Sequence, residues 1–255
     1  MPSSRSATSS TSTAATEDFI QNYDAFFGRL LPITLSGAGN HEYGRLARPA
    51  TSGTSATSPG APTAWYSFDI GSWHAIALNS AICSPYTGAP CGPGTPEYAW
   101  LKADLAAHPN SQYPCTLAFW HHPLFDWEKY QNNAWVQSFD YDRSKPFWKL
   151  LQRAGADVAL TGTQPQLPAL TCRWMPTEPY DPRDGIVEFI VGTGGRNTNA
   201  RSGVRRRDRR RSSPDRPTPM GILSMTLGTD GYSWRWIPAA GQPTGFIDAG
   251  TASCH

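Results

Sequence analysis

Two short polar clusters follow apolar stretches of the chain. Asn40 and His41 come after LPITLSG through a Gly-containing turn, and His121 and His122 follow CTLAFW. An Asn amide oxygen is a neutral metal ligand, and a His can ligate a metal or donate a proton to a phosphate oxygen or a leaving group. Each cluster alone also has a plainer interpretation: an Asx-turn beside a solvated His, and one packed beside one solvated His.

The segments that must position these clusters alternate between strand and helix patterns. TEDFIQNYDAFFGRLL predicts a helix, LPITLSG a short strand, and AWYSFDIGSWHAIALNS two strands joined at Gly71-Ser72. Thr95-Pro96-Glu97 begins a predicted helix that runs through WLKADLAAH, because Thr is a good N-cap and Pro suits the first turn. The strand CTLAFW then delivers the two His residues.

The second half continues the alternation. SKPFWKLLQRAGADVALTG predicts a helix, a Gly turn and a buried strand, and DGIVEFIVGTGG predicts a further strand. GILSMTL and YSWRWIPA flank the turn 228–231, which predicts a hairpin. The pattern indicates an α/β (α+β) fold, a layered β-sandwich flanked by helices. Both polar clusters follow strand ends, where open α/β sheets place their sites.

Composition bounds the class of protein. A chain of 255 residues with 39% hydrophobic residues and ten Trp is long enough for a globular core. No apolar stretch reaches the length of a membrane span, and the start of the chain has no signal peptide. The net charge of +2 arises mainly from the Arg run 204–216, which favours a solvated loop over a nucleic-acid patch because no aromatics are interleaved.

Taken together, the motifs resemble a known family. GNHEY at 39–43 is similar to the GNHE signature of calcineurin-like metallophosphatases and purple acid phosphatases. LAFWHHPLF resembles their next motif, a strand that ends in a ligand His two residues before Pro. The stretch 191–195 and the tail 238–255 resemble secreted actinobacterial members. The order and spacing of the motifs fit from about residue 16 to the C-terminus.

The resemblance implies hydrolysis of a small phosphate ester by a water that two metal ions activate, with divalent or trivalent ions of the Fe, Zn or Mn type. It makes Asn40 and His121 metal ligands and His41 the group that stabilises the phosphoryl oxygens or protonates the leaving group. Glu42 and His122 are expected to contact the ligands or to pack behind them. The resemblance also implies an extracellular protein without nucleic-acid or membrane partners.

Three further family motifs are absent: Asp-x-His, Gly-Asp-x-x-Tyr and Gly-His-x-His. The last should follow DVALTG, yet 163–168 reads TQPQLP and contains no imidazole. Permitted codons for 5–14 and for 162–170, read in a shifted frame, spell two of the missing motifs, so we expect frame errors there. The alternative function is that of a catalytically inactive relic that keeps the fold, with at most weak metal or partner binding.

These observations define the expected organisation. Residues 1–15 are a disordered or frame-shifted tail, and 16–255 form a single, N-terminally truncated domain in which 163–180 and 199–219 are suspect loops. Cys83 and Cys91 flank a short Pro/Gly loop, which predicts either a small disulfide or two free thiols. If Cys172 belongs to a frame-shifted stretch, Cys115 and Cys254 are candidates for a second bridge.

Overall fold

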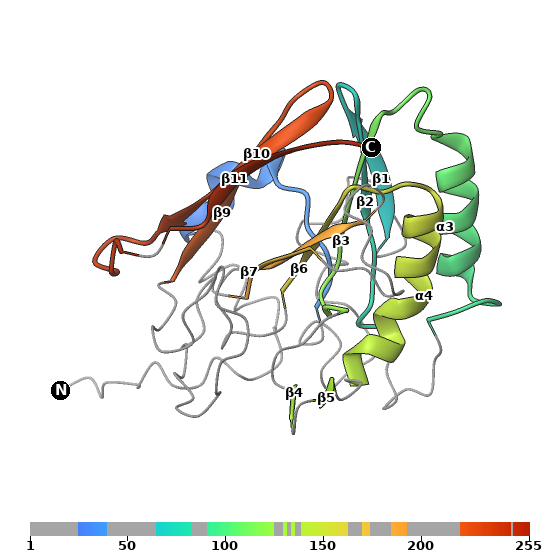
Figure 1. The fold of residues 1–255 in the computed structure, drawn as a ribbon, viewed down its shortest axis with the longest axis horizontal. Helices are drawn as coiled ribbons and strands as arrows, with labels where there is room; N and C mark the ends of the chain where they lie inside the picture. Colours follow the sequence, from blue (N-terminus) through green and yellow to red (C-terminus); the bar gives the residue numbers. More distant parts are fainter. Residues whose placement is uncertain are drawn as a thin grey trace.

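A computed structural model describes residues 25–39, 65–82, 91–124, 130–131, 134–135, 139–162, 170–173, 185–192, 220–245 and 247–255. Its elements, in chain order, are α2 (Ala25–Phe27), the 3-10 helix η2 (Gly28–Ile33), β1 (Tyr66–Ile70), β2 (Trp73–Ala77), α3 (Pro96–Ala107), β3 (Cys115–Phe119), β4 (Tyr130–Gln131), β5 (Ala134–Trp135), α4 (Phe139–Arg153), β6 (Val158–Thr161), β7 (Leu170–Arg173), β8 (Val187–Ile190), β9 (Gly221–Leu227), β10 (Gly231–Pro238) and β11 (Ala249–Ser253). The elements are drawn in Figure 1. The expected tail 1–15 lies outside these residues, as do nearly all of the two suspect loops.

The main sheet has six strands in the order β1-β2-β3-β6-β8-β7. Its four central strands β2, β3, β6 and β8 run parallel, whereas β1 and β7 pair antiparallel at the two edges. The carboxyl ends of the four parallel strands therefore lie along one edge of the sheet, which we call the C-terminal edge. Their starts lie along the opposite edge, which we call the N-terminal edge.

Each face of the main sheet is covered by a different layer. Helices α3 and α4 lie on one side in Figure 1, and the antiparallel sheet β11-β10-β9 lies on the other. Consecutive residues of β3 serve the two faces, since Ala118 packs with the helices and Leu117 with the second sheet. Trp73 meets Tyr232 edge-on across the second interface, with 5.8 Å between ring centroids. This arrangement confirms the predicted layered α/β fold.

Local sequence signals explain the elements around the site. Thr95 caps α3 by accepting a hydrogen bond from the backbone N–H of Tyr98 at 3.3 Å, and Pro96 occupies the first turn, as predicted. Gly155 ends the α4 turn with φ +73°, where a Cβ would meet Asn110 Nδ2 at 2.6 Å. The predicted strand pairs β1–β2 and β9–β10 are both present.

One predicted element is wrong. LPITLSG was expected to form a strand, but 31–33 belong to η2 and 34–39 form neither helix nor strand. Pro32 lies inside η2, and most residues of 32–37 are exposed. The apolar residues of this segment therefore do not belong to a buried strand. Within the described residues, no helix is long and apolar enough to cross a membrane.

Candidate functional site

Three segments of the chain meet at the C-terminal edge. His121 follows β3, and its carbonyl oxygen accepts a hydrogen bond from the backbone N–H of Gly162, which follows β6, at 3.0 Å. A Cβ built on Gly37 would lie 3.7 Å from the Phe119 ring at the end of β3. Gly39, which directly precedes Asn40, is buried. The described parts of the chain thus bring the approach to Asn40 toward the edge that carries His121.

His122 is fixed behind His121 by a buried serine. Its backbone N–H donates to Ser80 Oγ at 3.0 Å, and its Nδ1 lies 2.9 Å from the same oxygen. Both residues are buried, with 4% of His122 exposed. The rings of His121 and His122 meet edge-on, with 4.9 Å between centroids.

The Ser80 contact also occupies one nitrogen of the His122 ring. Ser80 Oγ can donate to Nδ1 or accept from it, because a hydroxyl oxygen keeps a second acceptor position after it accepts the backbone N–H of His122. Nδ1 is therefore committed to Ser80, so His122 does not offer that nitrogen to a metal.

Glu188 is a buried carboxylate at this edge that the sequence reasoning did not single out. It lies on β8, and its Oε1 accepts hydrogen bonds from Leu124 N–H at 2.9 Å and from Thr161 Oγ1 at 3.1 Å. These bonds tie the segment after His122 to β6 and β8. The signal was present in the sequence, because Glu188 is the one charged residue within the apolar run IVEFIV.

The remaining predicted site residues are only partly described. Asn40, His41, Glu42 and Cys83 lie outside the described residues. Cys115 and Cys254 form a disulfide, which joins β3 to the end of the chain across 139 positions of sequence. Cys91 is also disulfide-bonded.

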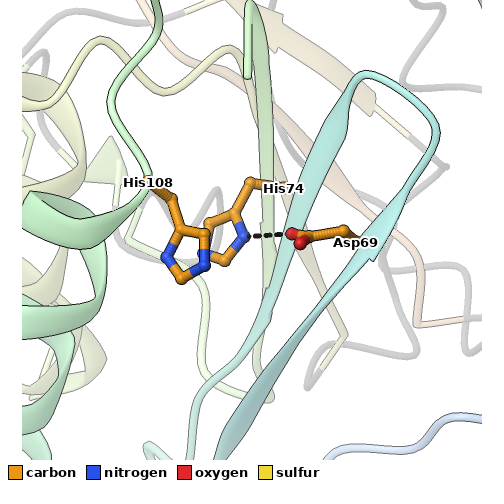
Figure 2. Close-up of side chains that lie close together, drawn as sticks. All are labelled: Asp69, His74 and His108. Carbon is orange, nitrogen blue, oxygen red and sulfur yellow. Dashed lines mark hydrogen bonds and ion pairs between the residues drawn. The ribbon is translucent and has the colours of Figure 1, made fainter. Parts of the chain in front are cut away.

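A second cluster of polar side chains lies at the N-terminal edge (Figure 2). His74, the second residue of β2, is fully buried. Its Nδ1 lies 2.8 Å from Asp69 Oδ1 on β1, and its Nε2 lies 2.8 Å from Asp104 Oδ2 on α3. The ring of His108, just after α3, stacks on it with 3.9 Å between centroids and 11° between the planes.

Asp69, His74 and His108 present potential ligand atoms within 4.8 Å of one another, but their geometry does not suit a metal. A ring nitrogen binds a metal through a lone pair that lies in the plane of the ring, and two nearly parallel stacked rings cannot both direct a lone pair at one ion. Both nitrogens of His74 are also occupied by carboxylates, and His108 Nδ1 donates to the Asp104 carbonyl at 2.8 Å. The cluster is a hydrogen-bond network.

Electrostatics in this cluster favour a charged ring. Burial lowers the pKa of His74, but hydrogen bonds to Asp104 and Asp69 outweigh burial and raise the pKa above the usual 6.5. For Asp69, burial raises the pKa, whereas the hydrogen bonds from His74 and Tyr113 outweigh it and lower the pKa below 3.8. The hydroxyl of Tyr113 donates to Asp69 Oδ2 at 2.9 Å.

The other group of nearby ligand atoms consists of Cys115, Asp157 and Cys254. The two sulfurs are bonded to each other, and Asp157 accepts backbone N–H groups from Thr116 at 2.8 Å and from His255 at 2.9 Å. This group fastens the end of the chain to β3. Within the described residues, neither group of potential ligands lies at the C-terminal edge.

The chain was compared with known proteins. No protein-family model matches it, and no curated protein sequence matches it significantly. Its fold is similar to the solved structure of a purple acid phosphatase isolated from yellow lupin (Lupinus luteus) seeds, with a TM-score of 0.65 at 18% sequence identity. The match covers 94% of this chain but 45% of the lupin chain, so this chain spans less than half its length. The likeness confirms the predicted metallophosphatase-like fold.

Proposed function

We propose that this chain is a phosphoesterase-type hydrolase whose site lies at the C-terminal edge, with Asn40, His41 and His121 as its working residues and a small phosphate ester as its substrate. The observation that carries the proposal is the placement of His121. It follows a central parallel strand, beside Gly162 and on the same edge that the chain approaches at Gly37 and at the buried residues Ala38 and Gly39 before Asn40. Open α/β sheets bind ligands at this edge.

Two independent likenesses support the proposal. The motifs GNHEY and LAFWHHPLF resemble those of calcineurin-like metallophosphatases, and the fold resembles that of the lupin purple acid phosphatase. The likeness of sequence concerns short segments, whereas the likeness of fold covers 94% of the chain.

The ligands do not fit a tightly held pair of metal ions. Among the described residues at the C-terminal edge, His121 has the place of a ligand, while His122 Nδ1 is bonded to Ser80 and Glu188 Oε1 accepts two hydrogen bonds. The sequence adds Asn40, but 163–168 contains no imidazole. Two ions need about four ligands each, and the readable set supplies fewer.

The residues of this chain nevertheless indicate what chemistry the C-terminal edge can perform. His121 offers a ring nitrogen toward a single ion or a phosphate oxygen, and His41 donates a hydrogen bond or a proton to a phosphoryl or leaving-group oxygen. Ser80 and Glu188 hold the segment that carries His121 through the bonds described above. A phosphoesterase acting with this set is expected to be slow.

The second candidate function is that of an inactive relative that keeps the fold. It is favoured by one observation: the stretch that begins directly after Gly162, next to His121, lacks the two His residues that the family motif requires. Such a protein would bind a metal or a partner weakly and would not turn over an ester.

The test combines bound metal with hydrolysis of an aryl phosphate. Purified chain is dialysed against Zn²⁺ or Mn²⁺, its metal content is measured, and release of the aryl alcohol is followed in wild type and in His121→Ala. The phosphoesterase predicts bound metal and slow turnover, both lost in the variant. Wild type without bound ions and with background turnover identifies the inactive relative.

We also propose that the protein acts outside the cell. The Cys115–Cys254 disulfide and the disulfide-bonded Cys91 support an oxidising compartment, because stable disulfides are rare in reducing ones. Mass spectrometry of the protein from its native source, alkylated before and after reduction, tests this proposal. Free thiols at Cys115 and Cys254 in the native protein would contradict it.

A further inference from the structure

Helix α3 has little apolar surface to hold it on the sheet. Leu101 is the one apolar residue of α3 that is fully buried, while Tyr98, Trp100 and Leu105 are only partly buried against the core. The other buried residue of the helix is Glu97, a carboxylic acid. Polar contacts must therefore contribute much of what holds α3 against the β1–β2 hairpin.

The strongest of these contacts passes through His74. Its two ring nitrogens face one carboxylate each, Asp69 from the hairpin and Asp104 from α3, both at 2.8 Å. Carboxylates only accept hydrogen bonds, so both nitrogens must donate, and only the protonated ring has two N–H groups. His74 thus joins the two elements as a cation between two anions.

Further groups donate to or pack on the two carboxylates and the ring. Ser67 on β1 donates to Asp104 Oδ1 at 2.7 Å, and Tyr113, before β3, donates to Asp69 Oδ2 at 2.9 Å. His108 stacks on the His74 ring, and its Nδ1 lies 3.6 Å from Asp104 Oδ1. The neutral ring would turn a lone pair toward one of the two carboxylates, which is repulsive.

We propose that protonated His74 is a latch that closes α3 onto the β1–β2 hairpin, and that loss of its proton as the pH rises releases the helix. The raised pKa of His74 means that its contribution to stability is fully present below the unfolded value of 6.5 and is lost as the pH rises through the folded pKa. The lowered pKa of Asp69 contributes stability above 3.8, which is lost as the pH falls through its folded pKa. The latch is therefore closed in mildly acidic solution.

A second contact, at the start of α3, also weakens as the pH rises. Glu97 Oε1 accepts the backbone N–H of Asn79, just after β2, at 2.6 Å. Glu97 Oε2 is buried and has no hydrogen-bond partner in the part of the chain that the structure describes. Burial raises the pKa of Glu97 to about 8, although the Asn79 hydrogen bond lowers it. No other group contributes to this shift among the described residues. A rise in pH thus disfavours the docked helix at both of its ends.

The test follows the protonation of His74 and the docking of α3 in the same protein. ¹⁵N NMR of the imidazole rings gives the titration of each His, and amide hydrogen exchange, corrected for its intrinsic pH dependence, gives the protection of α3 relative to α4. Wild type is expected to show both His74 nitrogens protonated at pH 6 and α3 protection that falls as the ring titrates. His74→Gln should lose the part of this pH dependence that follows the His74 titration and keep the part due to Glu97, while the matched variant His108→Gln keeps both.

The opposite results would overturn the latch. They are a His74 ring with a single protonated nitrogen at pH 6, α3 protection in wild type that does not change with the titration, or unchanged pH dependence in His74→Gln. If His74→Gln does not fold, Asp104→Asn decides the matter. Removing one of the two carboxylates should shift the His74 titration to lower pH, and an unshifted titration would contradict the latch.

Discussion

The backbone N–H of Gly162 donates to the carbonyl oxygen of His121 at 3.0 Å, so the residue after β6 lies beside the residue after β3. This contact places Gly162, the residue that precedes Thr163 in the chain, next to the metal-ligand candidate. The family resemblance expects two His residues in the segment that begins at Thr163, and this chain has none there. We therefore expect His residues restored directly after Gly162 to act together with His121.

Restoring the missing His residues should create metal affinity. Thr163→His with Pro165→His puts two imidazoles in the places that the Gly-His-x-His motif requires, and we expect tenfold or tighter binding of Zn²⁺, about 1.4 kcal/mol or more. Isothermal titration calorimetry measures the change. The same double substitution in a His121→Ala background should give a clearly smaller gain, and an equal gain would show that the new ligands act without His121.

Ser80→Ala should destabilise the C-terminal edge. It removes the buried hydroxyl that bonds both the backbone N–H and the Nδ1 of His122, which costs about 1–3 kcal/mol of unfolding free energy. Urea denaturation measures it. Ser72→Ala is the matched control, because its hydroxyl makes an exposed bond to the Thr229 carbonyl, and it should change stability by less than about 0.5 kcal/mol. An equal loss of unfolding free energy in the two variants would show that Ser80 does not stabilise the C-terminal edge more than an exposed serine stabilises its surroundings.

Glu97→Gln should flatten the pH dependence of stability. The folded pKa of about 8 lies above the unfolded value of 4.5, so folding takes up a proton between these values and the stability of wild type falls as the pH rises. The slope from this one group is up to about 1.4 kcal/mol per pH unit. The neutral amide cannot ionise, so Glu97→Gln should be the more stable protein at pH 8. A wild-type profile that the substitution leaves unchanged is the contrary outcome.

Removing the terminal disulfide should cost stability through the unfolded state. The bridge closes a sequence separation of 139 residues, and loss of so long a loop is expected to lower the unfolding free energy by about 2–5 kcal/mol. Cys115→Ala with Cys254→Ala is the variant, and thermal and urea unfolding are the measurements. The unfolding free energy lost in this variant should equal the loss that the wild-type protein shows in a reducing agent that breaks the Cys115–Cys254 bridge and leaves Cys91 bonded. A variant as stable as wild type would contradict this prediction and would mean that the pairing of β11 with β10 and the bond from His255 to Asp157 hold the tail without the bridge.

The fold could be predicted well where local chemistry sets the structure. Thr95 and Pro96 fix the start of α3, and the turn at 228–231 fixes the β9–β10 hairpin, because caps and tight turns depend on neighbouring residues. The strand predicted for LPITLSG is wrong because apolar residues alone do not show whether a segment has a partner strand. The Cys115–Cys254 pairing could be predicted only by setting Cys172 aside as part of a frame-shifted stretch, because no local signal in the sequence indicates it.

The candidate site could be predicted only in part. His121 was found because its motif is contiguous, whereas Ser80 and Glu188 bond its neighbours His122 and Leu124 from segments distant in sequence, and nothing in their spacing predicts these contacts. His74 looks like an ordinary core residue in the run SWHAIAL, since its partner Asp104 lies 30 positions away in sequence. Long-range electrostatic pairs of this kind follow from the packing of α3 on the sheet and cannot be derived from either segment alone.

The most direct test of where the chemistry lies compares the two edges of the sheet. Binding of Zn²⁺ and hydrolysis of an aryl phosphate are measured in wild type, His121→Ala and His108→Ala, with the fold of each variant checked by circular dichroism. We predict that wild type binds an ion and turns over slowly, that His121→Ala loses both, and that His108→Ala keeps both. Loss in His108→Ala with retention in His121→Ala would contradict the account, because it would move the metal and the chemistry to the N-terminal edge.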